Sequence, residues 1–327
     1  MNFDAIGGYF GLDLAPVANW RPDGIGVNSA RSALELILRA RQPSKVHLPS
    51  YCCSAVESAI PENIEICWYE INEEFEISNM PETSPEAPLL LVNYFGLKNE
   101  YAAAIVADKP GHVILDNSQA YYSQPFAEAD CIYSPRKFLP VPDGGIVVCD
   151  ALIDLPQKQA TSSNRAQYLL GRADVGPEPF FEYYKWAEAE IAKEPPMQMS
   201  ALTDQLLDHL DTERFAAKRR ENFQALDKRL RSLNRINLPM TDDTVPMVYP
   251  FWPSGEGLRE KLVENRVFAA RYWPEVAEMK QASNFENELS RNMVPLPIDQ
   301  RYDSSDMDRI AELCLSHLFG GLPGEPG

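Results

Sequence analysis

The sequence predicts an α/β protein with a mostly parallel central sheet flanked by helices, because short apolar runs alternate with helical segments. The clearest runs are residues 89–94 and 112–115, which lead into Gly96 and Asp116, and residues 145–149. Continuous apolar runs of this length are typical of strands that are buried on both faces of a sheet.

Helical segments and further strands fill the spaces between these runs. Residues 29–40 place leucines at helical spacing behind Ser29, whose hydroxyl suits an N-cap. The remaining elements predicted for this half are strands at 45–48, 64–69 and 131–133, and helices at 54–60 and 182–192. Together they form a large domain, which we place at residues 1–204.

The remaining residues, 205–327, predict a long connecting helix and a small α+β domain. The helical pattern runs from residue 200 to 233, with Arg219 and Arg220 expected on a solvated or interface face. Strands are predicted at 245–251 and 267–272, and helices at 258–265 and 306–318. At the termini, the Gly7–Phe10 segment is expected to pack in the core or line a site entrance, and the Gly/Pro-rich tail after Phe319 to lack structure.

Charge and composition exclude several classes of partner. Thirty basic and forty-eight acidic residues give a net charge of −18, which disfavours nucleic acid and anionic membranes. No apolar stretch is long enough to span a bilayer, and no secretory signal is expected. Six cysteines without a Cys-x-x-Cys pair and four scattered histidines predict reduced thiols, a cytoplasmic location and no metal site.

Lys137 is the first candidate for chemistry. It follows a predicted strand by a few residues, lies three residues after Ser134, and is surrounded by apolar and proline-rich sequence. A solvated loop lysine is the ordinary interpretation of such a residue. The rigid apolar setting instead predicts a lysine in a dry pocket, where the amine becomes a nucleophile for Schiff-base chemistry.

Two other segments suit a bound cofactor. Asp116 follows a buried strand directly, so it either faces the ligand crevice of an α/β sheet or caps the next turn. Small residues open the helix after Asn28, so the backbone N–H groups of Ala30 and Arg31 suit a phosphate. Taken alone, this segment favours an ordinary N-cap over a phosphate site.

Five motifs in chain order resemble the DegT/DnrJ/EryC1/StrS family of sugar aminotransferases, pyridoxal phosphate enzymes of fold type I. They span about 120 residues of the large domain, and the C-terminal third of the chain resembles the family only loosely. The motifs are Ser29–Leu34, the strand-to-helix segment Leu48–Ala55, Val92–Gly96, Asp116–Ala120, and Ser134–Lys137 with Gly144–Gly145.

The resemblance implies a role for each matching residue. Lys137 would form the Schiff base with pyridoxal 5'-phosphate and move the proton, and Asp116 would pair with the pyridine nitrogen. Gln119 would lie near the ring hydroxyl. Ser134, Ala30 and Arg31 would bind the phosphate.

Two departures from the family pattern concern the same site. Cys53 replaces the aromatic residue that usually stacks on the cofactor, so either Cys53 packs on the ring or Tyr51 takes over. The asparagine that reaches the neighbouring subunit's phosphate is missing, because Pro196–Ser200 stands in its place. Asn93, Arg271 and Tyr272 are weaker candidates for substrate contacts, and Arg301 is a further one. For Arg271 and Arg301 a structural ion pair is an equal alternative.

The resemblance implies transfer of an amino group from an amino acid, with glutamate expected, to a nucleotide-linked keto sugar in polysaccharide biosynthesis. The enzyme would be a homodimer with shared active sites. A different pyridoxal phosphate reaction, such as elimination or dehydration, and a non-catalytic regulatory or scaffold protein remain alternatives. Fold alone does not choose among them, because function depends on the site.

Overall fold

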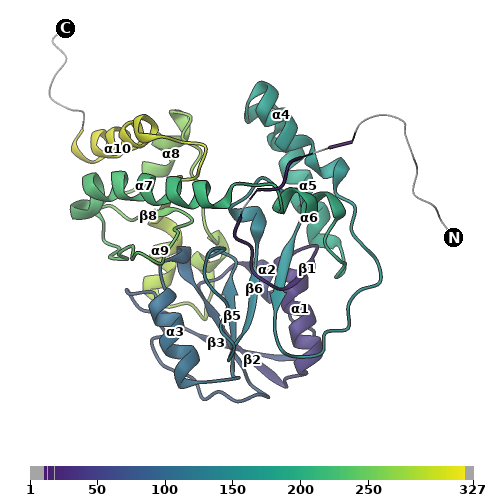
Figure 1. The fold of residues 1–327 in the computed structure, drawn as a ribbon. Coiled ribbons are helices and arrows are strands. Elements are labelled where there is room, and N and C mark those ends of the chain that lie inside the picture. Colours follow the sequence, from purple (N-terminus) through teal and green to yellow (C-terminus); the bar gives the residue numbers. More distant parts are fainter. Residues whose placement is uncertain (1–10, 13, 18, 321–327) are drawn as a thin grey trace, which may run out of the picture.

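The predicted α/β class is confirmed by a computed structural model, which describes residues 11, 12, 14–17 and 19–320. Its centre is a seven-stranded sheet with the order β1-β7-β6-β5-β4-β2-β3 (Figure 1). The strands are β1 (Ile25–Val27), β2 (Lys45–Pro49), β3 (Glu65–Tyr69), β4 (Leu89–Val92), β5 (Val113–Asn117), β6 (Asp130–Tyr133) and β7 (Gly145–Val148). The pairs from β3 to β6 are parallel, and β7 is antiparallel to both β6 and β1.

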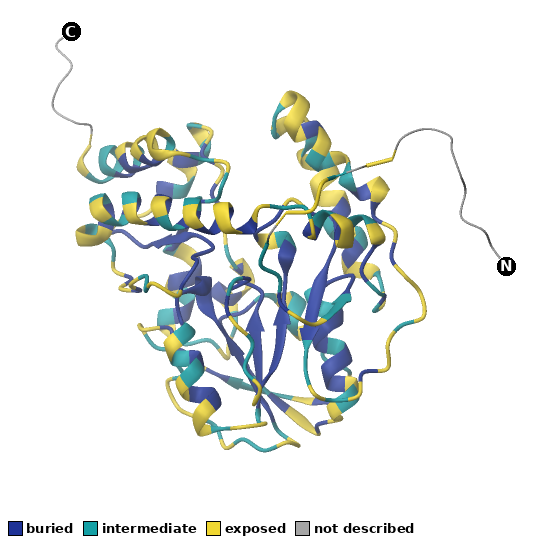
Figure 2. Ribbon diagram, viewed as in Figure 1, coloured by how far each residue is buried: buried dark blue, intermediate teal, exposed yellow. Residues whose placement is uncertain are grey.

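Helices of the first half cover this sheet. Helix α1 (Ala30–Arg41) packs against β6 and β7 through its apolar face. Its start is set by Ser29, whose side chain accepts a hydrogen bond from the Ser32 N–H, as predicted. Helix α2 (Ser54–Glu57) is shorter than expected, and helix α3 (Asn99–Asp108) follows the 3-10 turn Tyr94–Gly96. The sheet is the most deeply buried part of the chain (Figure 2).

The prediction of one long helix over residues 200–233 was wrong, because Asp211 interrupts it. Helix α6 (Ala201–Leu207) ends before Asp211, and helix α7 (Thr212–Leu230) begins directly after it. The Asp211 side chain accepts a hydrogen bond from the Arg214 N–H. An aspartate is a strong N-cap, so it starts a new helix here. Before them, helices α4 (Gln167–Val175) and α5 (Phe181–Lys193) form a hairpin that projects from the body (Figure 1).

The small C-terminal part packs around α7. Strands β8 (Tyr249–Phe251) and β9 (Val294–Leu296) are antiparallel, and α7 packs against β8 and α10 (Ser304–Phe319). Helices α8 (Leu258–Glu264) and α9 (Asn284–Asn292) complete it. The predicted strand at 267–272 is wrong, since this segment is irregular between the positive φ values of Arg266 and Trp273.

The predictions for the two ends of the chain are not tested by the structure. The Gly7–Phe10 segment and the tail beyond Gly320 lie outside the described residues. In the part of the chain that is described, no helix has the length and apolar character needed to cross a bilayer. The division at residue 204 stays a prediction.

Candidate functional site

Topology brings the predicted site residues to one edge of the sheet. Strands β2, β4, β5 and β6 run in parallel, so Asp116 near the end of β5 lies at the same edge as the segments after the other three strands, which carry Cys53, Asn93 and Lys137. Strand β7 runs the other way, and therefore its first residue, Gly145, lies at this edge as well. The carboxyl edge of an open α/β sheet is the usual place for a ligand.

The turn before α1 is pinned to the start of β7. The Gly144 N–H donates to the Asn28 carbonyl at 2.9 Å, and Ser29 bridges to Gly144. A Cβ on Gly145 would clash with the backbone of Ser29 and Ala30, so only glycine permits this close approach. The result is a fixed helix start whose first N–H groups, at Ala30 and Arg31, have no intrahelical partner.

Positive charge surrounds this helix start. The half-buried Arg31 donates from Nη1 to the Ile191 carbonyl at 3.3 Å, and its buried Nε has no hydrogen-bond partner among the described residues. Burial lowers the pKa of Arg31; nearby Cys53 raises it, and the Arg136 guanidinium lowers it further. Arg136 itself pairs with Glu188 of α5. Two neighbouring cations beside free N–H groups form a setting suited to a phosphate.

Asp116 is the penultimate residue of β5 and is almost fully buried, with 5% of its surface exposed. Its Oδ1 accepts from the Ser118 N–H at 2.8 Å, so the turn-capping role considered from the sequence is present. Gln119, three residues on, is also buried, and its Oε1 accepts from the Phe95 N–H at 2.9 Å. The oxygen of the Gln119 amide is therefore occupied, and its nitrogen is the group left to meet a ligand.

Lys137 lies in the 3-10 turn Pro135–Lys137 that follows β6. Ser134 is buried, but the Lys137 side chain is exposed in the single chain. The expectation of a dry pocket around the lysine was thus wrong for one subunit, because the apolar residues after it, Phe138 and Leu139, turn into the core instead of covering it. The roles assigned to Lys137 and Ser134 stay predictions.

The structure distinguishes the surroundings of Cys53 and Tyr51, the two candidates for packing on the cofactor ring. Tyr51 is fully buried, and its ring packs against Trp273 at 4.6 Å between centroids and against Phe75 at 6.2 Å. Cys53 is half-buried and lies near Arg31, whose pKa it raises. This placement favours Cys53 over Tyr51 as the residue beside a ligand at the edge of the sheet.

The weaker substrate candidates differ in accessibility. Asn93 is buried, and its amide donates to Asn99, Asn117 and Ser123, which favours a structural role over the predicted substrate contact. Arg271 is exposed and forms no ion pair with a described residue. Tyr272 is half-buried and stacks on Phe95 at 6.4 Å; burial raises its pKa.

The structure decides the settings of two arginines of the second half, Arg301 and Arg219. Arg301 pairs with Asp299 at 2.6 Å, so the ion-pair alternative holds for it. The expectation that Arg219 lies on a solvated or interface face was wrong, since its surface is only 2% exposed. Its position four residues from Phe215 and four from Phe223 places it on the apolar face of α7, and that spacing is the signal that sequence reasoning missed.

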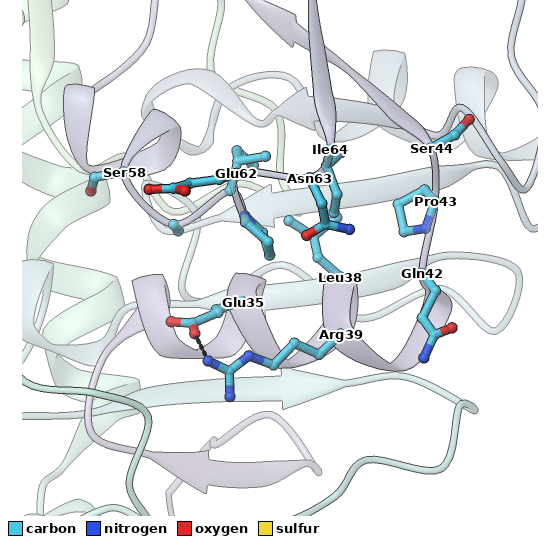
Figure 3. Close-up of a pocket in the computed structure, with 13 residues that line it drawn as sticks. Glu35, Leu38, Arg39, Gln42, Pro43, Ser44, Ser58, Glu62, Asn63 and Ile64 are labelled. Atoms are coloured by element: carbon cyan, nitrogen blue, oxygen red, sulfur yellow. Dashed lines mark hydrogen bonds and ion pairs between the residues drawn. The ribbon is translucent and has the colours of Figure 1, made fainter.

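A separate surface groove lies at the other end of the sheet (Figure 3). Its lining comes from the middle and C-terminal part of α1, including Glu35 and Arg39, and from residues 58–64. Ser44, also in the lining, directly precedes β2. The groove is therefore near the amino ends of the parallel strands and is not the candidate site.

The architecture has clear relatives among solved structures. A DegT DnrJ EryC1 StrS aminotransferase from Brucella abortus is 14% identical, with a TM-score of 0.60 over 90% of this chain and 85% of that one. The chain has the fold of that aminotransferase. The protein Spr1654 from Streptococcus pneumoniae in its PMP form is 15% identical, with a TM-score of 0.62 over 90% of this chain and 87% of the other.

A third relative is DesI, solved in the presence of its TDP-sugar product. It is 15% identical, with a TM-score of 0.59 over 92% of this chain and 82% of that one. No family model and no curated protein matches the sequence. The likeness thus establishes a shared fold over nearly the whole chain, and the chemistry rests on the residues at the site.

The residues at this edge fit pyridoxal phosphate. A phosphate is matched by the free N–H groups of α1, by the unpartnered Arg31 Nε, and by the hydroxyl of Ser134. A pyridinium nitrogen is matched by the Asp116 carboxylate, which lies on the neighbouring strand to Ser134. The exposed amine of Lys137 completes this set of groups.

Proposed function

We propose that this protein is a pyridoxal phosphate-dependent aminotransferase that acts on a nucleotide-linked keto sugar. The observation that carries the proposal is the gathering of Lys137, Asp116 and the glycine-pinned start of α1 at one edge of the sheet. The shared fold supports it, because the structures with this fold include an aminotransferase and a protein bound to a TDP-sugar.

Each residue has a defined task in this proposal. When bound, the cofactor accepts an amino group from one substrate, stores it and gives it to the other. Ala30, Arg31 and Ser134 hold the phosphate, and Asp116 keeps a proton on the ring nitrogen by presenting a carboxylate to it. Lys137 Nζ removes the proton from the substrate carbon that bears the amino group and returns a proton to the carbon that receives it.

The partners are part of the same proposal. Glutamate is the expected donor and a nucleotide-linked keto sugar the acceptor, with surface polysaccharide synthesis as the setting that the sequence resemblance favours. A homodimer is expected because Lys137 is uncovered in one chain. The α4–α5 hairpin supports this, since it exposes large apolar side chains, among them Leu170 at 66% and Phe181 at 54%.

A direct test of the cofactor uses absorbance and mass spectrometry. Pyridoxal phosphate added to the protein should produce a visible absorption band, and borohydride reduction should leave a pyridoxyl group on Lys137. Lys137→Ala should abolish both, whereas Lys185→Ala, which removes an exposed lysine of α5, should change neither. A label spread over surface lysines would contradict the proposal.

The donor and the assembly need separate measurements. Glutamate should bleach the visible band and release 2-oxoglutarate; bleaching by another amino acid alone would refute glutamate as the donor. Sedimentation should show a dimer that Trp186→Glu on α5 disrupts, with Leu152→Glu, at an equally apolar exposed position outside the hairpin, as the control. A wild-type monomer would refute the shared-site assembly.

A further inference from the structure

The position of the Lys137 amine depends on the backbone beneath it. Its side chain is exposed, and no hydrogen bond or ion pair to a described residue holds it. The Lys137 N–H donates to the Ser134 carbonyl at 3.3 Å inside a single 3-10 turn. A lysine on so short a turn can be placed only by what fixes the residues on either side of it.

Phe138, the next residue, supplies that anchor. Its side chain is buried, with ring centroids 6.1 Å from Tyr121 and 5.7 Å from Tyr122. Its carbonyl oxygen accepts two hydrogen bonds from the C-terminal part of the chain, from Gln300 Nε2 at 2.8 Å and from Arg219 Nη2 at 3.3 Å. The peptide unit between Phe138 and Leu139, one residue beyond Lys137, is thus held from the C-terminal part of the chain.

Arg219 is an unusual residue for this task. It is buried, and no carboxylate of residues 19–320 forms an ion pair with it. Its hydrogen bonds go to the carbonyls of Phe138, Met247 and Pro246, and its guanidinium lies 4.7 Å from the centre of the Phe138 ring. Its Nε has no partner among the described residues. Burial lowers the pKa of Arg219, and the nearby Asp299 carboxylate opposes this only in part. A buried cation with no carboxylate bonded to it is costly, and an apolar residue would fill this face of α7 at a smaller cost in free energy.

A chain of hydrogen bonds also connects the Arg219 guanidinium to Gln119, another residue of the candidate site. Met247 donates its N–H to the Phe95 carbonyl at 2.8 Å and accepts from Arg219 Nη1 at 2.9 Å. The Phe95 N–H in turn donates to Gln119 Oε1 at 2.9 Å. One hydrogen-bonded path therefore runs from Gln119 through Phe95, Met247 and Arg219 to the carbonyl beside Lys137.

We propose that Arg219, together with Gln300, is a positioning residue that sets the Lys137 amine for its bond to the cofactor. The inference rests on the proposed function, because it assigns Lys137 that bond. Arg219 does not touch the cofactor in this proposal. It fixes the Phe138 carbonyl, one residue beyond Lys137, and ties it to the segment that carries Gln119.

Two forms of the cofactor separate positioning from general damage. Pyridoxal phosphate can bond to a lysine, whereas pyridoxamine phosphate lacks the aldehyde and binds only through the other groups of the site. We expect Arg219→Met and Gln300→Met to weaken binding of pyridoxal phosphate about tenfold and that of pyridoxamine phosphate less than about twofold. Equilibrium dialysis against each cofactor measures both affinities without a catalytic assay.

Two controls make the result specific. Gln205→Met removes a glutamine side-chain bond of the same 2.8 Å length, to the Leu12 carbonyl, and should leave both affinities unchanged. Arg219→Lys keeps the positive charge but loses the planar guanidinium that donates to both the Met247 and the Phe138 carbonyls. It should therefore behave as Arg219→Met does. Thermal unfolding identifies a variant that fails to fold, and Gln300→Met then decides the question.

The outcomes separate this inference from the proposed function. Equal weakening of both cofactors, or of neither, in variants that fold would overturn the positioning role while Lys137 still bonds pyridoxal phosphate in the wild type. A wild-type protein that binds the two cofactors equally and leaves no label on Lys137 would overturn the proposed function and the inference together.

Discussion

Gly145 lies directly against the backbone of Ser29, at a separation that leaves no room for a side chain between β7 and the start of α1. This contact holds the first turn of α1 over the edge of the sheet where Asp116 and Lys137 emerge. A single missing Cβ thus places the free N–H groups of the helix.

Replacing that glycine should damage the site before it damages the fold elsewhere. In Gly145→Ala the added Cβ must push away the Ser29 carbonyl and the Ala30 N–H. We expect affinity for pyridoxal phosphate to fall at least about tenfold, with a lower melting temperature. Gly11→Ala, where a Cβ meets nothing within 4 Å, is the control. Unchanged affinity would show that the α1 start does not hold the phosphate.

Arg31 should contribute charge to the same subsite. Arg31→Met removes the guanidinium and should lower affinity for pyridoxal phosphate about tenfold in dilute buffer, with a smaller loss in high salt because ions screen the interaction. Titrations at two salt concentrations measure this difference. Arg39→Met, on the exposed face of α1 where Arg39 pairs with Glu35, should have no effect. A loss that salt does not alter would point to packing of the side chain instead.

Cys53 should report occupancy of the site. It is half-buried, whereas neighbouring Cys52 is 6% exposed and burial raises the pKa of the Cys52 thiol well above its usual value. We expect a maleimide to label Cys53 but not Cys52, and pyridoxal phosphate to slow that labelling. Peptide mass spectrometry locates the modification. Cys67, which lies on β3 and is partly exposed, is an internal control, because the cofactor should not slow its labelling.

Glu286 should be needed for stability. This fully buried residue of α9 accepts from Ser50 Oγ at 2.8 Å and from the Ile71 N–H at 3.1 Å, and so joins the small part of the chain to the end of β2. Glu286→Ala leaves these donors unpaired and should cost about 2 to 4 kcal/mol in the free energy of unfolding. Urea denaturation measures the loss, and Glu288→Ala on the exposed face of α9 should cost little.

The same carboxylate predicts a pH dependence. Burial raises the pKa of Glu286, although hydrogen bonds from Ser283, Ser50 and Ile71 lower it in part. Folding therefore favours the protonated form: the stabilisation is complete below the unfolded pKa of about 4.3 and is lost as pH rises through the folded value. Relative to Glu286→Gln, the wild type should lose stability as pH rises from about 4. A difference that is flat or rises with pH contradicts this sign.

Local patterns predicted most of the large domain. The apolar runs at β4, β5 and β7 and the serine before α1 depend on neighbouring residues only, so spacing and capping were enough to find them. The same holds for Asp116, near the end of β5, and for Lys137, a few residues after β6. In the small part, β9 was missed because its three residues, Val294–Leu296, are too few to show a periodic pattern, and 267–272 was mistaken for a strand because most of it is apolar.

By itself, then, the sequence determined the fold class and the order of the candidate site motifs, since both follow from periodicity along the chain. Only the tertiary structure decided which side chains are accessible and which are held. In the folded chain Lys137 is exposed, whereas Tyr51 and Asn93 are buried. Arg219 donates to the Phe138 carbonyl, 81 residues away in sequence. Such contacts depend on the packing of distant segments, and no local spacing encodes them.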